Sequence, residues 1–415
     1  MSGAPIISCD STMEHDTTEK SVTWNSDTTY ALGLYKLITR ILGIWPPKCE
    51  DIFSKTRVAL LAFLQITMMA SFIGEVNTDC SSINDIVEVI SLLACAVLSL
   101  LKVVVLRAFR PKMLEIINSS LEDWTTVKRP KSRKIMKNYA KIGRSVCIFQ
   151  MTSAYVTTIP MIIAALPFLA PEVNATGSNE SVPALRGLPL RTVCIFGDMP
   201  DLIYALVFTL QALQLLATCT GNIGNDVYFF GITMHLCGQF HLLGEDLESF
   251  QMDVDEWAQR KKLVNLIKRH VRLSQLAQYL EDSFNFIILV QLSANAFQMC
   301  LMGIQMILSL KLGNTLMVVN TVIVIYVMSL QLFLYSYAGD RLSSQIENLR
   351  VSAYFFPWYE FSPKLGRDVL FMIMRNHKSF SITAGKVYRI DIDNFKNLIK
   401  ALGSYFSVLR IMFDA

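Results

Sequence analysis

Apolar blocks without a single charge are the feature that most limits how this 415-residue chain can fold. Five of them cover residues 58–74, 145–171, 202–225, 284–310 and 312–339. Each is close to or longer than the roughly 17–25 residues with which an α-helix crosses a bilayer. A sixth block, 85–107, includes Glu88 and Lys102 around an uncharged centre, and we expect Lys102 to extend toward the membrane surface. The sequence therefore predicts six membrane-spanning helices.

The composition agrees with this prediction. Apolar residues make up 52% of the chain and charged residues 17%, and the mean hydropathy is +0.40. Soluble domains carry about 25% charged residues, so this chain has too few charges to cover a surface that faces water. A disordered chain, a coiled coil and most soluble enzymes are thereby excluded. The net charge of +4 is too small and too dispersed for nucleic-acid binding, so membrane lipid is the expected environment.

The positions of the basic residues predict the orientation of the chain in the membrane. Lys and Arg are concentrated in every second loop, namely 107–144, 260–272 and 341–378. The intervening loops, 75–84 and 172–200, hold almost none. The N-terminus is therefore expected in the cytoplasm. The N-terminal region is polar and lacks the apolar core of a cleavable signal peptide, so the first span is expected to act as the insertion signal.

The loop between spans three and four, assigned to the outside, contains two sequons for N-glycosylation. They begin at Asn174 and Asn179, whereas a third sequon at Asn118 lies in a loop assigned to the inside and is expected to stay unmodified. Cys80 and Cys194 also lie in outer loops. Two alternatives remain open for this pair, a disulfide bond in an oxidising compartment or two free thiols.

Motifs for catalysis and metal binding are missing from the sequence. It contains no nucleophile elbow, phosphate-binding glycine loop, HExxH helix or dinucleotide fingerprint. His235, Cys237 and His241 are close in sequence, but the step of six between the histidines places them off a common helical face. We therefore expect neither an enzyme nor a bound metal or cofactor.

A seventh helix is predicted at residues 391–413, a stretch about 34 Å long and thus able to cross a bilayer. One side of this helix is apolar, and the other carries a stripe that begins with polar residues and narrows to aliphatic ones. The stripe residues considered as pore-lining are Asn394, Asn397, Ser404, Val408 and Ile411. A spanning helix of this kind faces a water-filled path or a protein interior; the alternative is an amphipathic helix lying on the membrane surface. Because apolar constrictions gate pores by dewetting, we predict Val408 as the gate.

The tail GSYFSVLRIM and the segments YSYAGDRLSSQ at 335–345 and AYFFPWYE at 353–360 resemble the insect odorant receptor family, and they are most similar to the receptors of ants, bees and wasps. The most specific is the tail GSYFSVLRIM, which is similar to the family's C-terminal signature. The resemblance extends over nearly the whole chain. It includes YSYAGDRLSSQ at 335–345, AYFFPWYE at 353–360, LFMIMRNHKSFSITAGKVYRIDIDNF at 370–395, LEDW at 121–124 and KIGR at 141–144.

The resemblance implies an all-α membrane protein of seven transmembrane helices, with a cytoplasmic N-terminus, an extracellular C-terminus and a cytoplasmic helical anchor. It implies the following division of the chain: a cytoplasmic segment at 1–56, six spans and their loops at 57–339 with a cytoplasmic extension at 225–283, an anchor segment at 340–383, and the pore-lining helix and tail at 384–415. It further implies an odorant-gated, non-selective cation channel in the plasma membrane of olfactory sensory neurons. The channel would be a hetero-tetramer with a shared odorant co-receptor.

The resemblance also places the odorant pocket in the outer half of the bundle. At that depth the chain has mostly apolar or aromatic residues and a few hydroxyls, which suit a volatile hydrophobic ligand. The candidate residues are Val87, Ser91, Tyr155, Ile159, Tyr204, Phe208, Met302, Met306 and Thr321. Each of them has packing as its alternative role. The aromatic residues of the anchor, among them Phe229, Phe230 and Phe240, are expected at subunit interfaces.

Three other classes of membrane protein fit the sequence less well. A G-protein-coupled receptor also has seven spans, but its orientation would be reversed and no NPxxY motif occurs here. Gustatory receptors share the architecture but end in a Tyr-aliphatic-Gln-Phe pattern that this tail lacks. A scaffolding membrane protein leaves the polar stripe of the last helix without an explanation.

Overall fold

The computed structural model describes residues 24–46, 52–77, 83–166, 187–190, 192–196, 199–250, 255–356, 358–375 and 380–414. Nearly all of these residues are helical. The helices are α1 (Ser26–Ile41), α2 (Ile52–Val76), α3 (Ile83–Ala108), α4 (Arg110–Thr126), α5 (Pro130–Ala164), α6 (Val193–Phe196), α7 (Asp201–Glu248), α8 (Glu256–Lys311), α9 (Thr315–Phe355), α10 (Pro363–Arg375) and α11 (Ile392–Asp414). A 3₁₀ turn η1 (Trp358–Glu360) precedes α10, and a hairpin of β1 (Thr383–Ala384) and β2 (Tyr388–Arg389) precedes α11.

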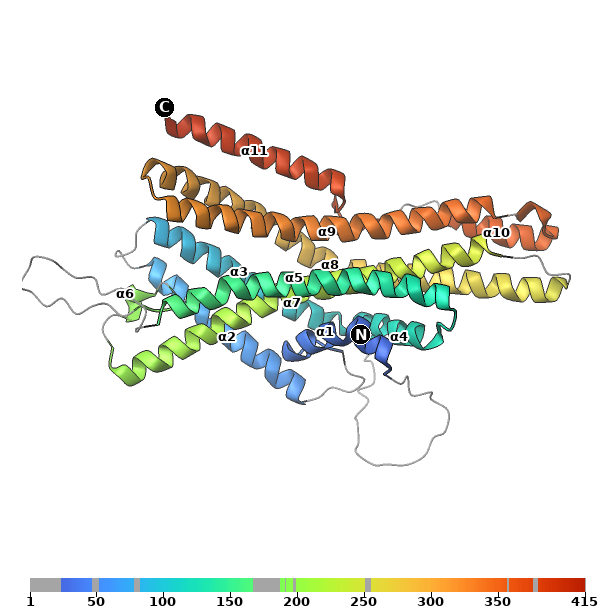
Figure 1. Cartoon of the computed structure of the whole chain (residues 1–415), viewed down its shortest axis with the longest axis horizontal. Helices are drawn as coiled ribbons and strands as arrows, with labels where there is room; N and C mark the ends of the chain where they lie inside the picture. Colours follow the sequence, from blue (N-terminus) through green and yellow to red (C-terminus); the bar gives the residue numbers. More distant parts are fainter. Residues whose placement is uncertain are drawn as a thin grey trace, which may run out of the picture.

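The six apolar spans are confirmed, because α2, α3, α5, α7, α8 and α9 are each long and apolar enough to cross a membrane. Four of these helices continue far beyond the bilayer. The longest, α8, has 56 residues and is therefore about 84 Å long, whereas the apolar core of a bilayer is about 30 Å thick. The helices α5, α7, α8 and α9 run side by side along the long axis, with α10 at one end and the α8–α9 turn at the other (Figure 1).

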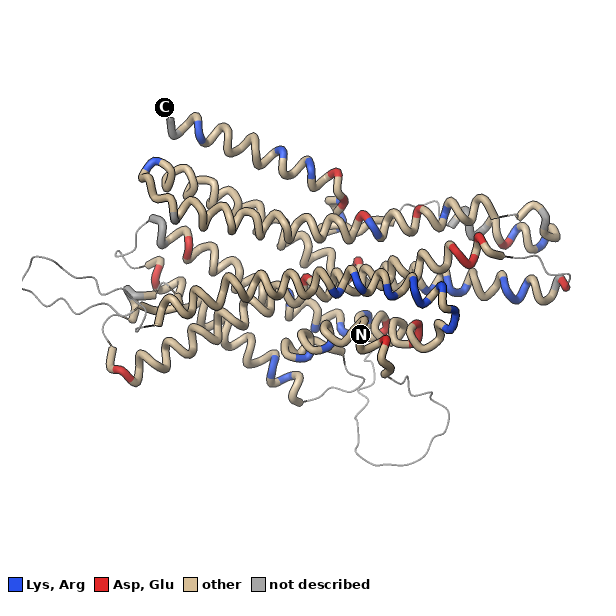
Figure 2. The backbone as a smooth tube through the Cα atoms, viewed as in Figure 1, with Lys and Arg blue, Asp and Glu red and all other residues tan. Residues whose placement is uncertain are grey.

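Several helices extend beyond the predicted spans, and at the third span both boundaries differ. The apolar block there covers residues 145–171, but α5 runs from Pro130 to Ala164. Pro160 lies inside α5, which continues for another turn beyond it. The basic residues from Lys131 to Arg144 therefore lie on a helix that extends the third span. Figure 2 shows the Lys and Arg residues gathered in the half of the molecule that contains α4 and α10, while the central stretches of the spans are almost uncharged.

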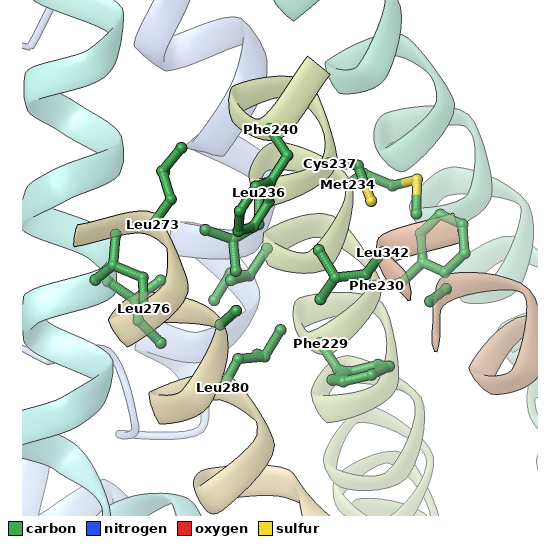
Figure 3. Packing of buried hydrophobic residues seen from close by; sticks show 14 of the residues in the cluster. Phe229, Phe230, Met234, Leu236, Cys237, Phe240, Leu273, Leu276, Leu280 and Leu342 are labelled. Carbon is green, nitrogen blue, oxygen red and sulfur yellow. The ribbon is translucent and has the colours of Figure 1, made fainter. Parts of the chain in front are cut away.

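The main hydrophobic core lies in the basic half of the molecule. Most residues of α7 between Val227 and Leu247 are buried on all sides of the helix, because α1, α5, α8 and α9 surround it. Figure 3 shows this packing, in which Phe229 and Phe240 from α7 lie near Leu276 and Leu280 from α8.

The expected role of the α7 aromatics at a subunit interface is therefore wrong. Phe229, Phe230 and Phe240 are each no more than 2% exposed within the single chain. Exposed aromatics of this half include Tyr354, Phe355 and Tyr359, near the end of α9 and in η1, and Trp257 at the start of α8.

The N-terminal helix α1 is held against α5 and α7 by Tyr35. The tyrosine is 3% exposed, and its ring fits where two glycines leave room. A Cβ atom on Gly231 of α7 would lie 2.3 Å from Tyr35 Cζ, and one on Gly143 of α5 would lie 2.8 Å from its hydroxyl oxygen. Asp27 at the start of α1 adds an ion pair with Lys137 of α5 at 3.1 Å. Burial opposes ionisation of Asp27, but hydrogen bonds from Lys137 and Arg133 lower the pKa of its carboxyl group.

Substitution of Gly231 by alanine tests this contact. A methyl group there overlaps the Tyr35 ring, so Gly231→Ala is expected to lower the free energy of unfolding by about 1–3 kcal/mol. Gly244→Ala is the matched control, because a Cβ on that glycine of the same helix meets nothing closer than 3.8 Å. The two unfolding temperatures are compared in lipid nanodiscs. Equal temperatures would show that the ring has room to move aside.

Candidate functional site

The outer end of the bundle is closed by a segment of the loop that precedes α7. Leu190 is fully buried in a small apolar cluster with Phe72 of α2 and Val89 of α3. Gln211 of α7 fixes this segment, because its Oε1 accepts from the Leu190 amide at 3.1 Å and its Nε2 donates to Thr192 Oγ1 at 2.8 Å. The outer half thus contains a packed apolar interior with a few polar groups directed into it. This is the usual composition of a small-molecule site.

Two candidate odorant-binding residues, Tyr204 and Phe208, lie together on α7. Their rings are 6.1 Å apart and one helical turn from each other. Tyr204 is 8% exposed and donates its hydroxyl to the Gly187 carbonyl at 2.7 Å. Tyr204 therefore contacts the loop that precedes α7, and Phe208 lies beside Tyr204.

Two further candidates join helices through hydrogen bonds. The hydroxyls of Tyr155 on α5 and Thr220 on α7 are 2.7 Å apart. Gln298 of α8 donates to the Ser91 carbonyl of α3 at 2.8 Å and to its hydroxyl at 3.2 Å. Each pair crosses between two helices of the bundle.

The other five candidates differ in exposure. Met302 on α8 and Thr321 on α9 are buried, and the Thr321 hydroxyl donates to the Met317 carbonyl at 2.8 Å. Val87 and Met306 are half-buried. Ile159 on α5 is 45% exposed on the surface of the chain. The contact of these nine residues with a ligand stays a prediction.

A row of amides on α8 is the feature that the sequence reading missed. Gln291, Asn295, Gln298 and Gln305 recur at steps of four, three and seven, so they lie on one face of the helix. All four are buried, with exposures of 2%, 1%, 1% and 7%. The spacing is visible in the sequence, but the uncharged block that contains these residues was read as uniformly apolar. This amide stripe faces the interior of the bundle.

The expectation that Lys102 extends to the membrane surface is wrong. Its side chain is fully buried, and its Nζ lies 2.6 Å from Asp226 Oδ1 of α7. A buried ammonium group needs a counter-charge and hydrogen-bond acceptors. The partner carboxylate is available inside the bundle, which is why the side chain turns inward.

One face of α11 packs against the bundle. Phe395, Leu398 and Leu402 pack against Met299 of α8 and Leu332 of α9. Further along, a Cβ on Gly303 of α8 would lie 2.2 Å from the ring of Phe406, so that ring rests directly on the glycine.

The opposite face of α11 is exposed. Val408 is 56% and Ile411 69% exposed, and Asn397 and Ser404 are exposed as well. Asn394 is different: it is half-buried, and its side chain donates to the Arg389 carbonyl at 2.8 Å. Four of the five predicted stripe residues therefore share the exposed face, while Asn394 links α11 to the hairpin.

The hairpin before α11 is fixed to α8 through an acidic pair. Thr383 donates to Glu281 at 2.5 Å, and Lys386 lies 2.9 Å from Asp282. Lys112 of α4 contacts the same Asp282 carboxylate at 2.8 Å. Burial opposes ionisation of Asp282, but hydrogen bonds from Lys112 and Lys386 bring its pKa to about 2. Because that pKa is depressed, the contact is present at neutral pH and is lost only as the pH falls toward 2.

Several predicted sites lie in parts of the chain that the structure does not describe. The sequons at Asn174 and Asn179 and the cysteine Cys80 fall outside the described residues. Cys194 lies in α6, but its side chain is not among those described. Their glycosylation and pairing stay predictions.

The chain is similar in sequence to known odorant receptors. The family model for the 7tm odorant receptor matches residues 82–403. Odorant receptor Or1 of Anopheles gambiae is 20% identical over 91% of this chain and 94% of its own length. Odorant receptor 13a of Drosophila melanogaster is 23% identical over 77% of this chain and 78% of its own. For odorant receptor 10 of Aedes albopictus the match is 22% identical and spans 51% of this chain and 56% of that relative.

Solved structures show the same fold. The insect olfactory receptor OR5 from Machilis hrabei covers 91% of this chain and 97% of its own, with a TM-score of 0.68 and 16% sequence identity. A second structure of that receptor, in complex with eugenol, also gives a TM-score of 0.68. The fold is therefore that of a multi-pass, seven-helix, all-α membrane protein. The chain belongs to the insect odorant receptor family.

Proposed function

We propose that this chain is the odorant-binding subunit of a ligand-gated, non-selective cation channel. The observation that carries the proposal is the division of α11 into two faces. Its apolar face packs on α8 and α9, while Asn397, Ser404 and Val408 are exposed on the surface of the chain. Exposing such a face to lipid is unfavourable. A pore formed by α11 helices from several subunits gives this face water instead.

The partner in this pore is an odorant co-receptor, in a hetero-tetramer at the plasma membrane of olfactory sensory neuron dendrites. Exposed aromatics at the cytoplasmic end support contact between subunits. Tyr354, Phe355 and Tyr359 are 64%, 77% and 72% exposed. Aromatic residues are enriched at protein interfaces, and clustered exposed apolar groups mark contact surfaces.

The ligand is a volatile, mostly hydrophobic molecule that binds in the outer half of the bundle. The apolar character of Met302, Met306 and Phe208, together with the hydroxyls of Tyr155 and Thr321, supports a pocket of this chemistry. The related receptor that was solved with eugenol binds a small aromatic molecule of the same general kind.

Expression with and without the co-receptor tests the assembly. Cells that express both chains are expected to give odorant-evoked cation currents, and cells with this chain alone are expected to give none. Whole-cell recording with a panel of volatile esters, alcohols and terpenes measures the response. Currents of equal size without the co-receptor would contradict the assembly, and currents abolished by blocking G proteins would contradict the channel.

Substitution of Val408 by serine tests the gate. An apolar constriction closes a pore by excluding water, so Val408→Ser is expected to raise the current in the absence of odorant several-fold. Ile399→Ser, on a different side of the same helix and 37% exposed, is the control and is expected to leave the basal current unchanged. An unchanged basal current in Val408→Ser channels would place the gate elsewhere.

A further inference from the structure

A buried ion pair lies at the centre of the helix bundle. Lys102 of α3 and Asp226 of α7 are 2.6 Å apart, with side chains that are 0% and 3% exposed. Lys102 also donates to the Asn222 carbonyl of α7 at 3.3 Å. The two residues are 124 positions apart in the sequence, so the pair fixes α3 against α7 at this depth.

Asp226 is also the acceptor for two groups from α9. Tyr335 donates its hydroxyl to Asp226 Oδ1 at 2.5 Å, and Gln331 donates its amide to Oδ2. The Asp226 carboxylate of α7 thus accepts hydrogen bonds from both α3 and α9. Hydrogen bonds to a charged group are stronger than those between neutral groups, and a low-dielectric interior strengthens them further.

The cluster continues from Gln331 into the amide stripe of α8. Gln291 donates to Gln331 Oε1 at 3.1 Å, and Asn295 reaches the same oxygen at 3.4 Å. Gln291 also donates to Asn295 at 2.8 Å. Four helices are therefore joined through one connected set of buried polar side chains.

The two ends of this set lie at different functional regions. On the odorant side, the set is linked through Cys95 of α3: Asn222, whose carbonyl accepts from Lys102, donates to the Cys95 carbonyl at 2.8 Å, and Gln298 of α8 donates to the Cys95 thiol at 3.6 Å. Gln298 also binds Ser91, one of the candidate odorant-binding residues. At the inner end, Gln291 and Tyr335 line a small pocket whose other wall is formed by Asn394 and Phe395 of α11. The polar set therefore reaches from the odorant-binding depth to the base of the pore-lining helix.

One acceptor in this set is unsatisfied. Within the described chain, the buried Oε1 of Gln291 accepts no hydrogen bond, and Gln331 Oε1 is shared by two donors. A buried acceptor without a partner is unfavourable, so rotation of these amides or a shift of α8 against α9 offers a competing set of bonds. An element with two arrangements is what coupling between distant sites requires.

We propose that Asp226 is a positioning residue for gating: through Tyr335 and Gln331 it fixes α9, and with α9 it fixes the base of α11. The inference rests on the proposed channel function and names the residues that connect its two sites. Odorant binding beside Gln298 shifts the amide stripe, and the shift reaches α11 through Gln331 and Tyr335.

Tyr335→Phe removes one hydrogen bond to Asp226 and leaves the ion pair intact. The loss of a bond to a charged group changes a conformational equilibrium by about tenfold or more. We therefore expect the half-maximal odorant concentration to rise about tenfold and the maximal current per surface receptor to fall. Current is recorded with the co-receptor present, and surface receptor is counted by biotinylation.

Tyr228→Phe is the matched control. Tyr228 lies half a turn from Asp226 on α7, is 1% exposed, and its hydroxyl has no hydrogen-bond partner within the described chain. This variant is expected to respond like the wild type. Equal responses of the two variants would overturn the proposal, as would a loss of current in Tyr335→Phe that only follows its surface level. If the current of Tyr335→Phe falls only because fewer receptors reach the surface, Gln331→Leu repeats the test. A wild-type response of the Gln331→Leu channel would also contradict the proposal.

A thiol-modification measurement separates this inference from the proposed function, because it needs no odorant. Ser404→Cys on the exposed face of α11 is modified with a cationic methanethiosulfonate reagent. The rate measured with the chain that lacks this introduced cysteine is subtracted as background. Combining Ser404→Cys with Tyr335→Phe is expected to change the rate of thiol modification several-fold, whereas combining it with Tyr228→Phe is expected to leave that rate unchanged. Equal rates would overturn the positioning role. A wild-type channel that responds to no odorant would instead overturn the proposed function alone.

Discussion

The pairing of Lys102 with Asp226 is the constraint on which the arrangement of the bundle depends. Inside a bilayer an isolated charge is highly unfavourable, and breaking a buried pair by removing one partner costs about 3–5 kcal/mol. The pair is 2.6 Å long and fully enclosed. Asp226 also accepts hydrogen bonds from Tyr335 and Gln331, so the positions of α3, α7 and α9 are fixed together. The amide stripe of α8 faces the same interior, because Gln291 donates to Gln331.

Outside the membrane the same helices form a conventional hydrophobic core. Residues of α7 such as Phe229 and Phe240 are buried by α1, α5, α8 and α9, and Tyr35 locks α1 into place against Gly231. The helices run without interruption from this core into the membrane. In contrast, α11 contacts the bundle through one apolar face and the docked hairpin. The least enclosed spanning helix is thus the one assigned to the pore.

Much of this could be read from the sequence. Six spans follow from uncharged blocks, and the two faces of α11 follow from residues at three- and four-residue steps. The partner of Lys102 could not be identified, because no local pattern relates positions 124 residues apart. Hydropathy detects only the part of a helix inside the bilayer, so the extensions of α7 and α8 at 225–283 were indicated by the family resemblance instead, and the start of α5 at Pro130 was not predicted. The burial of Phe229 depends on neighbours from four helices, which composition does not reveal.

The candidate odorant-binding residues illustrate the same limit. Their depth could be inferred from the family resemblance, but their partners could not. Gln298 and Thr220, which hydrogen-bond Ser91 and Tyr155, became apparent only in three dimensions. Glutamine at helical spacing within an apolar span was the available signal. Polar residues that recur on one face of a spanning helix point to an interior with a role beyond packing.

The most direct test of this account replaces the ion pair by apolar residues, singly and together. Lys102→Met and Asp226→Leu each leave one buried charge, so each single variant is expected to reach the surface poorly. The double variant removes both charges and is expected to recover its surface level. Its odorant-evoked current per surface receptor is nevertheless expected to stay far below that of the wild type, because Tyr335 and Gln331 have lost their acceptor. A double variant that reaches the surface and gates like the wild type would contradict the account.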